Sequence, residues 1–258
     1  MGGRARIVGA GRAGTSFERA LTTAGWEVAP LVRRGEPLAG AARDVDVVII
    51  ATSDGSIAEV AAAIDPAPGA VLHLSGALGP GPVATHPRHG VLHPLVALPD
   101  AERGADRLVG AWFGLAQGGD HVAERIVADL GGTAVRIADS DWSRYHAAAV
   151  IAANHLVALL GQAERVGASV GLPLAALMGL AEGSLRDVAD LGPAAALTGP
   201  VRRGDLATVQ RHLDGLPHDE RDAYRAMAEQ AARLLPDPPT PDPPSPEPSS
   251  LEPDEVLP

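Results

Sequence analysis

The chain of 258 residues contains no cysteine and no lysine, and each absence narrows the chemistry that it can perform. Without cysteine it can form no disulfide, no thiolate metal site and no thiol nucleophile. Without lysine it has no Schiff base and no lysine general acid. All 21 basic residues are arginines, which stay charged and rarely take over that role. We therefore expect no metal site and a proton chemistry that does not rest on an amine.

Clustered basic residues and long apolar runs are also absent. The formal net charge is −11, and no group of arginines stands out, so we expect no nucleic-acid partner. No charged-then-apolar segment precedes the first predicted strand, and no run of about 18 uninterrupted apolar residues occurs. These absences predict a soluble cytoplasmic protein that has no membrane partner.

The end of the chain differs from the rest in composition. From Pro236 onward there are ten prolines, six acidic residues and no basic residue, which leaves a net charge of −5 on the preceding part. Such a segment cannot bury enough apolar surface to offset the entropy of ordering, so we predict a disordered acidic tail at 236–258. The alternative is a proline-rich ligand for a small recognition domain.

The most informative feature that is present is a glycine-rich turn, Gly9-Ala10-Gly11-Arg12-Ala13-Gly14, between a predicted strand at 4–8 and a predicted helix at 15–24. In this setting Gly9 permits the tight turn, Gly11 lets the backbone approach a pyrophosphate, and Gly14 allows close packing of helix and strand. The free N–H groups of the helix start face the anion. The motif predicts a bound dinucleotide held by Gly9, Gly11, Arg12, Ala13 and Gly14.

The second predicted strand ends close to Arg33 and Arg34, about 20 residues beyond the glycine turn. An acidic residue at this place binds the ribose hydroxyls of NAD, whereas arginine accommodates the extra phosphate of NADP. The pair, with Arg12 nearby, therefore favours NADP over NAD. The alternative is that these arginines are solvated loop residues. Thr52 and Ser53 follow the third predicted strand and are expected beside the nicotinamide half.

Strand and helix patterns alternate up to Asp139 and then give way to helices alone. The predicted strands after the first lie at 26–32, 45–52, 70–74, 90–92, 111–115 and 133–137. The predicted later helices lie at 142–166, 173–189, 205–213 and 219–235. Such alternation is typical of an α/β fold with a doubly wound, mostly parallel sheet. We predict a dinucleotide-binding Rossmann domain at 1–139 and an all-helical domain for substrate binding or dimerisation at 140–235.

Candidate catalytic residues follow two of these strands and lie on the first long helix. Ser75 and His93 come at strand ends, where a histidine can exchange a proton at a carbonyl or alcohol and a serine can orient its oxygen. His146, Val150 and Asn154 are spaced by four and share a helix face, with His155 roughly opposite His146. The alternative is structural: histidines at strand ends that bond to backbone, as His73 could, or buried polar pairs in a helical core.

A loop between the later helices, residues 198–205, offers a weaker candidate site. Its glycines suit a tight loop near a ligand, and Thr198 and Arg203 are candidates for binding a substrate carboxylate. Asp205 is a good N-cap for the next predicted helix. A purely structural helix connection is the alternative.

Taken together, these motifs resemble the Rossmann-type oxidoreductases with a helical second domain, among them pyrroline-5-carboxylate reductase, prephenate dehydrogenase and ketopantoate reductase. They most resemble a bacterial group whose second domain is of unknown function, DUF2520. The segments that carry this resemblance are 9–14, 73–76, 93–95, Asn154 and 196–205. Ser75 and His93 also resemble the serine and the histidine-proline element of prephenate dehydrogenases, which implies that they act on a substrate hydroxyl.

The sequence departs from the similar β-hydroxyacid dehydrogenases at one position. Those enzymes carry a lysine four residues before the asparagine that Asn154 resembles, and Val150 stands there in this chain. The proton would then have to come from His93 or His146.

The motifs lead to two predictions of function. The first is an NADP-dependent oxidoreductase that acts on a small carboxylate-bearing ketone, imine or alcohol, with ketopantoate as the first substrate to test. The alternative is a non-catalytic NAD(P)-binding sensor or dimeric interaction module, which the missing lysine favours. In both cases the alanine-rich helices, poor in aromatic residues, permit close packing and predict a homodimer.

Overall fold

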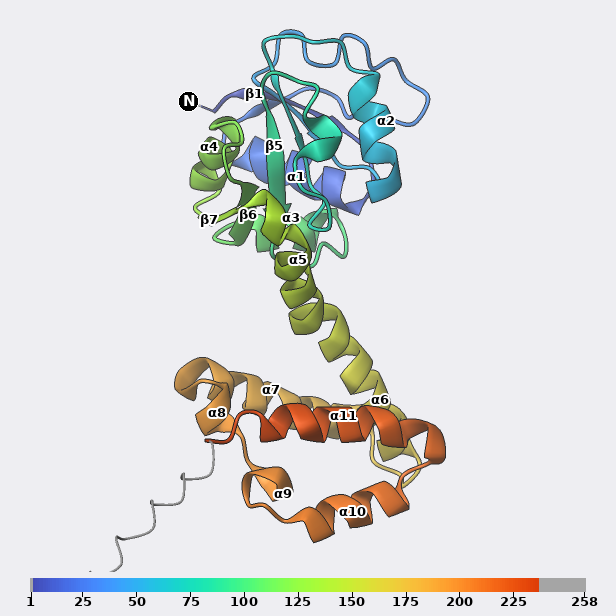
Figure 1. Ribbon diagram of the computed structural model, residues 1–258. Coiled ribbons are helices and arrows are strands. Elements are labelled where there is room, and N and C mark those ends of the chain that lie inside the picture. The colour runs from blue at the N-terminus through green and yellow to red at the C-terminus, as the bar shows by residue number, and fades with distance from the viewer. Residues whose placement is uncertain (1, 237–258) are drawn as a thin grey trace, which may run out of the picture. The chain divides into compact units, whose positions relative to one another are not determined.

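The computed structural model describes residues 2–236 and divides into two compact units (Figure 1). The first unit extends through Val157, and the second begins at Ala158. From residue 237 onward the predicted acidic tail lies outside the described residues.

The first unit is built on a seven-stranded sheet with the order β2-β1-β3-β4-β5-β6-β7. All neighbouring strands are parallel except β5 and β6, which are antiparallel. The strands are β1 (Arg4–Val8), β2 (Glu27–Val28), β3 (Val47–Ile50), β4 (Ala70–His73), β5 (His89–Pro94), β6 (Trp112–Ala116) and β7 (Thr133–Ile137). The predicted α/β fold with a mostly parallel sheet is confirmed. Because the chain order reverses between β1 and β3, a ligand crevice is expected at the carboxyl ends of these two strands.

Both faces of this sheet are covered. The four residues of β3 are fully buried, with Val47 and Ile49 in one apolar cluster and Val48 and Ile50 in another. The first cluster includes side chains of α1 (Arg12–Thr23), α3 (Ala101–Leu108) and α4 (Val122–Asp129), and the second includes those of α2 (Ile57–Ala62). This two-sided burial is why β3 is a continuous apolar run without alternation.

Two details of the first unit differ from the sequence prediction. The second strand is only two residues long, with Val32 forming a single further bridge to Val8. Glu27 and Ala29 donate to carbonyls in and just before β1, but the next donor is Val32 and not residue 31, so the alternation of the ladder is broken there. Helix α3 was not predicted, although its N-cap residue, Asp100, is of a type that favours a helix start. The Asp100 carboxylate accepts a hydrogen bond from the backbone N–H of Arg103 at 2.8 Å.

The long helix that leaves the sheet contains a change of helix type. Helices α5 (Trp142–Val150) and α6 (Leu156–Ala168) are joined by a π-helical turn, Ile151–His155. Such turns are rare and occur frequently at functional sites. Among the described residues, one helix, Asp139–Ala168, is long enough and apolar enough to cross a membrane by length and composition alone. Apolar helices that pack against other parts of a protein pass the same test.

The second unit is entirely helical over its described residues. Beyond α6 it consists of α7 (Leu174–Leu191), α8 (Pro193–Ala196), α9 (Gly199–Arg202), α10 (Leu206–Gly215) and α11 (Arg221–Ala232). The predicted cap of α10 is confirmed, since Asp205 accepts a hydrogen bond from the Thr208 backbone at 3.0 Å. Of the described residues in this unit only Gly167 and Glu220 are buried, so its apolar side chains have no core of their own.

Candidate functional site

The glycine-rich turn connects β1 to α1, and its three glycines meet different surroundings. Gly9 has a φ of 114°, and a Cβ there would lie 2.6 Å from the carbonyl oxygen of Ala51. A Cβ on Gly14 would collide with the carbonyl oxygen of Gly9. Packing within the chain therefore explains both glycines. Gly11, the N-cap of α1, has no atom within 4 Å of a Cβ position, so its missing side chain leaves open space above the helix start.

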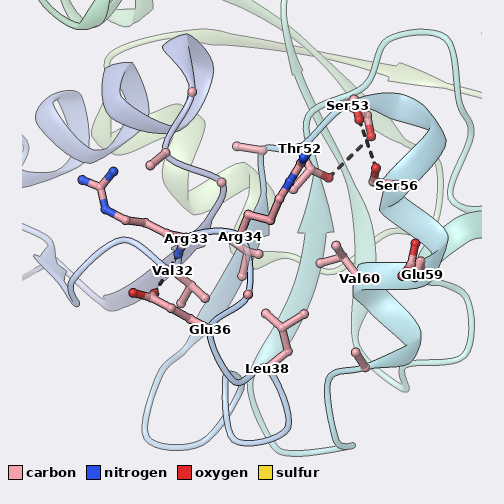
Figure 2. Close-up of a pocket in the computed structure, with 17 residues that line it drawn as sticks. Val32, Arg33, Arg34, Glu36, Leu38, Thr52, Ser53, Ser56, Glu59 and Val60 are labelled. Carbon is pink, nitrogen blue, oxygen red and sulfur yellow. Dashed lines mark hydrogen bonds between the residues drawn. The ribbon is translucent and has the colours of Figure 1, made fainter.

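A cavity of ≈ 500 Å³ lies beside this turn, at the carboxyl ends of β1 and β3 (Figure 2). The loop after β2 and helix α2 form its other walls. Of the predicted cofactor residues, those that line it are Gly9, Gly11, Arg33, Arg34, Thr52 and Ser53. Arg12, Ala13 and Gly14 are not among its lining residues but form the first turn of α1 next to it.

The two arginines of this cavity are held differently. The backbone N–H of Arg33 donates a hydrogen bond to the Glu36 carboxylate at 2.7 Å. This bond closes the loop and engages one oxygen of that carboxylate. Figure 2 shows the Arg34 side chain extending toward Thr52 and Ser53, while the Arg33 guanidinium points away from them. The cavity thus has a cationic group on its loop side and hydroxyls at the end of β3.

His73 and Ser75 form a hydrogen-bonded turn at the end of β4. Nε2 of His73 donates to the carbonyl oxygen of Gly79 at 3.0 Å, and its Nδ1 accepts the backbone N–H of Ser75 at 3.2 Å. Burial lowers the pKa of His73, which keeps the ring neutral. The Ser75 hydroxyl oxygen in turn accepts the N–H of Ala77. His73 therefore has the structural role that the alternative interpretation described.

His93 meets two aromatic residues of α5 at the end of β5. Its Nδ1 lies 2.7 Å from the Tyr145 hydroxyl, and the two rings are arranged edge to face with centroids 5.5 Å apart. The His146 ring centroid is 6.0 Å from that of His93. Burial, followed by the proximity of His146, lowers the pKa of His93 to about 4, so its imidazole is neutral at physiological pH.

Tyr145 belongs to this candidate site but was not predicted from the sequence. It lies 52 positions from His93, and no spacing rule connects a helix residue to a strand at that separation. The sequence contained only a weak indication of Tyr145: it is one of two tyrosines in the chain, and it stands next to the candidate His146.

A surface depression of ≈ 470 Å³ brings three of the four predicted catalytic residues together. His93, His146 and Asn154 line it along with Tyr145 and apolar side chains of the long helix. Ser75 does not line it and is buried in the neighbouring turn.

One predicted orientation is wrong. His155 was expected on the opposite side of the helix from His146, yet both line another depression of ≈ 480 Å³ together with Ala77. The π-helical turn at Ile151–His155 is wider than an α-helical turn, so it shifts His155 around the axis relative to an ideal helix.

Thr198 and Arg203 belong to the second unit. They flank α9 on its two sides, Thr198 as its N-cap and Arg203 as its C-cap, and both are exposed.

Comparison with known families and structures agrees with this fold. Residues 114–231 match the profile of a domain of unknown function (DUF2520), which confirms the resemblance predicted from the motifs. The match covers Asn154 and the segment 196–205, whereas the motifs at 9–14, 73–76 and 93–95 lie before it. A search of curated proteins found no match.

Several solved structures have the same fold at low sequence identity. Protein TM1727 of Thermotoga maritima is 21% identical, with a TM-score of 0.69, and the alignment covers 89% of this chain and 97% of that one. A Bacteroides fragilis protein provisionally named an NADP oxidoreductase is 19% identical, with a TM-score of 0.73 and coverage of 90% and 98%. Pyrroline carboxylate reductase of Plasmodium falciparum, with NADP bound, is 13% identical, with a TM-score of 0.59 and coverage of 90% and 97%.

Proposed function

We propose that this protein is an NADP-dependent oxidoreductase that transfers a hydride between the nicotinamide cofactor and a small ketone, imine or alcohol. The observation that carries the proposal is the open space at Gly11, next to the cavity at the point where the strand order reverses. Gly9 and Gly14 are required by packing, whereas Gly11 is required by nothing in the chain. A ligand that must approach the backbone explains it.

The residues of this region can bind the phosphate groups of the cofactor, although two glutamates, Glu36 and Glu59, line the cavity along with the two arginines. The first N–H groups of α1 are free to bind a pyrophosphate, and the partial positive charge of the helix start favours it. Arg34 and Arg33, with Arg12 at the start of α1, would hold the additional phosphate of NADP. Thr52 and Ser53 would border the other half of the molecule. When bound, the cofactor supplies or accepts the hydride.

The side chains beside His93 are suited to hold the reacting oxygen or nitrogen of the substrate. His93 offers a neutral imidazole, and Asn154 offers an amide at the edge of the same depression. A short keto acid such as ketopantoate is the first substrate to test. No arginine lines this depression. Thr198 and Arg203, in the second unit, stay candidates for binding a carboxylate.

The proposal predicts that the protein prefers NADPH to NADH and that replacing two arginines removes this preference. In an Arg33→Ala/Arg34→Ala variant, we expect the affinity for NADPH to fall about 10- to 100-fold, because charge-assisted hydrogen bonds to the extra phosphate are lost. The affinity for NADH should not change. Fluorescence titration of both nucleotides measures this, with Arg43→Ala, whose side chain pairs with Asp65 away from the cavity, as the control. Tighter binding of NADH than of NADPH by the unaltered protein would contradict the assignment.

Turnover separates the enzyme from the alternative, a cofactor-binding sensor. We expect NADPH oxidation with at least one member of a panel of short keto acids, neutral ketones and cyclic imines. Binding of NADPH without oxidation by any of them would favour the sensor, which the absence of lysine supports.

We also propose that the protein is a homodimer, on the basis of its second unit. Several large apolar side chains there are exposed, among them Leu180 at 72% and Leu206 at 76%, and no apolar side chain is buried among the described residues of this unit. Because uncovered apolar surface of this extent is unfavourable in water, a second copy would stabilise it. Light scattering at micromolar concentration should give twice the mass of one chain, and the mass of a single chain would refute the proposal.

A further inference from the structure

Two glycines, one in the turn after β4 and one in β6, leave the space for the contact between Tyr145 and His93. Gly114 of β6 is the residue directly opposite His93 of β5 in the antiparallel register. A Cβ on Gly114 would overlap the Tyr145 hydroxyl oxygen, so the phenol reaches Nδ1 of His93 only because no side chain stands there. On the other side, a Cβ on Gly76 would lie 2.5 Å from Nε2 of His93. The His93 ring therefore lies against the turn that contains Gly76, and the Tyr145 phenol fills the space that Gly114 leaves in the middle of β6.

The direction of the hydrogen bond follows from the groups around the phenol. Burial raises the pKa of Tyr145 to about 12, so its O–H keeps its proton. The O–H needs an acceptor, and Nδ1 of His93 lies at 2.7 Å. A neutral imidazole carries one proton, so accepting at Nδ1 leaves that proton on Nε2.

The opposite nitrogen of His93 faces a second imidazole. The same Cβ position on Gly76 lies 2.8 Å from Nδ1 of His146, so the two nitrogens converge on one point beside the turn. Nδ1 of His146 is buried and has no hydrogen-bond partner among the described residues. Both rings also line the depression that contains Asn154.

We propose that Tyr145 is a positioning residue: by donating its O–H to Nδ1 of His93, it fixes the imidazole with the proton on Nε2, where it is a hydrogen-bond donor to a substrate. This inference rests on the proposed function and specifies the substrate group, which must be an acceptor such as a carbonyl oxygen or an imine nitrogen. The effect of Tyr145 on the reaction passes through His93.

Nitrogen NMR of the histidine side chains tests the tautomer without any substrate. In ¹⁵N-labelled protein near pH 7, we expect Nε2 of His93 to resonate as a protonated nitrogen and Nδ1 as an unprotonated one. The signals are assigned by their loss in His93→Ala. In Tyr145→Phe, Nδ1 should shift toward the protonated form. A wild-type spectrum with the proton on Nδ1 would overturn the proposal, even if the variant failed to fold.

A matched pair of variants tests the effect on turnover. Tyr145→Phe removes one hydroxyl, and we expect kcat to fall about tenfold or more while the Kd for NADPH is unchanged. The control is Tyr224→Phe, because Tyr224 is the other tyrosine of the chain and bonds Nδ1 of His212 at 2.6 Å within the second unit. We expect this control to keep its kcat. An unchanged kcat in folded Tyr145→Phe would refute the role, whereas absence of turnover in the wild type would refute the proposed function and leave the NMR result to decide the tautomer.

Discussion

Replacing Gly11 with valine is expected to abolish NADP(H) binding and to leave the protein folded. The backbone of Gly11 has a φ of −80°, which valine adopts without strain, and no atom lies within 4 Å of its Cβ position. The added side chain would instead occupy the space through which a pyrophosphate must reach the start of α1. We expect the affinity to fall roughly 100-fold or more, about 2.7 kcal/mol, in a calorimetric titration. The Tm should fall by only a few degrees, because valine is a poorer N-cap than glycine.

The matched control for this experiment is Gly14→Val. Its Cβ would collide with the carbonyl oxygen of Gly9, so this variant should lose stability, by about 3 kcal/mol or more, or fail to fold. The two glycines, three residues apart, would thus separate a requirement of the ligand from a requirement of the fold. Normal NADPH binding by Gly11→Val would show that no phosphate lies on this turn and would remove the basis of the proposed function.

The second large effect is expected at His93. His93→Ala should lower kcat by roughly 100- to 10,000-fold, because the variant has no group to donate to the reacting oxygen or nitrogen. The affinity for NADPH should stay within about twofold, since His93 does not line the cofactor cavity. Steady-state kinetics and nucleotide titration on the same preparation measure the two quantities.

An exposed histidine provides the control for that variant. The His121 side chain is 81% exposed, and His121→Ala should behave as the wild type does. If His93→Ala retained full turnover, the depression beside the long helix would not be the reaction site. If it lost NADPH binding instead, His93 would contribute to the cofactor site.

The sheet could be predicted from the sequence because each of its signals is local. The run at 47–50 is apolar throughout since β3 is covered on both faces, and the segment 4–14 combines a strand, three glycines and a helix start within a few residues. The predicted strand at 133–137 coincides with β7. The second strand was predicted too long, because the pattern of apolar residues does not show where the hydrogen bonds to β1 lose their alternation, between Ala29 and Val32.

The candidate site was predicted only in part, because it depends on contacts between distant segments. His93, His146 and Asn154 were chosen from strand ends and helix spacing, and they line one depression. Tyr145 was not chosen, and Ser75 was expected in contact with a substrate although its hydroxyl oxygen holds a turn. The position of His155 was wrong because a π-helical turn has no signature in the spacing of the residues.

By itself, the sequence determined the α/β class, the glycine turn and the change to helices after Asp139, since propensity, periodicity and glycine geometry act over short separations. Only the tertiary structure decided which side chains meet. The register of β5 against β6 sets Gly114 opposite His93, and the packing of α5 brings Tyr145 into the space that this glycine leaves. Such a meeting depends on the pairing of whole elements, and no pattern within either element encodes it.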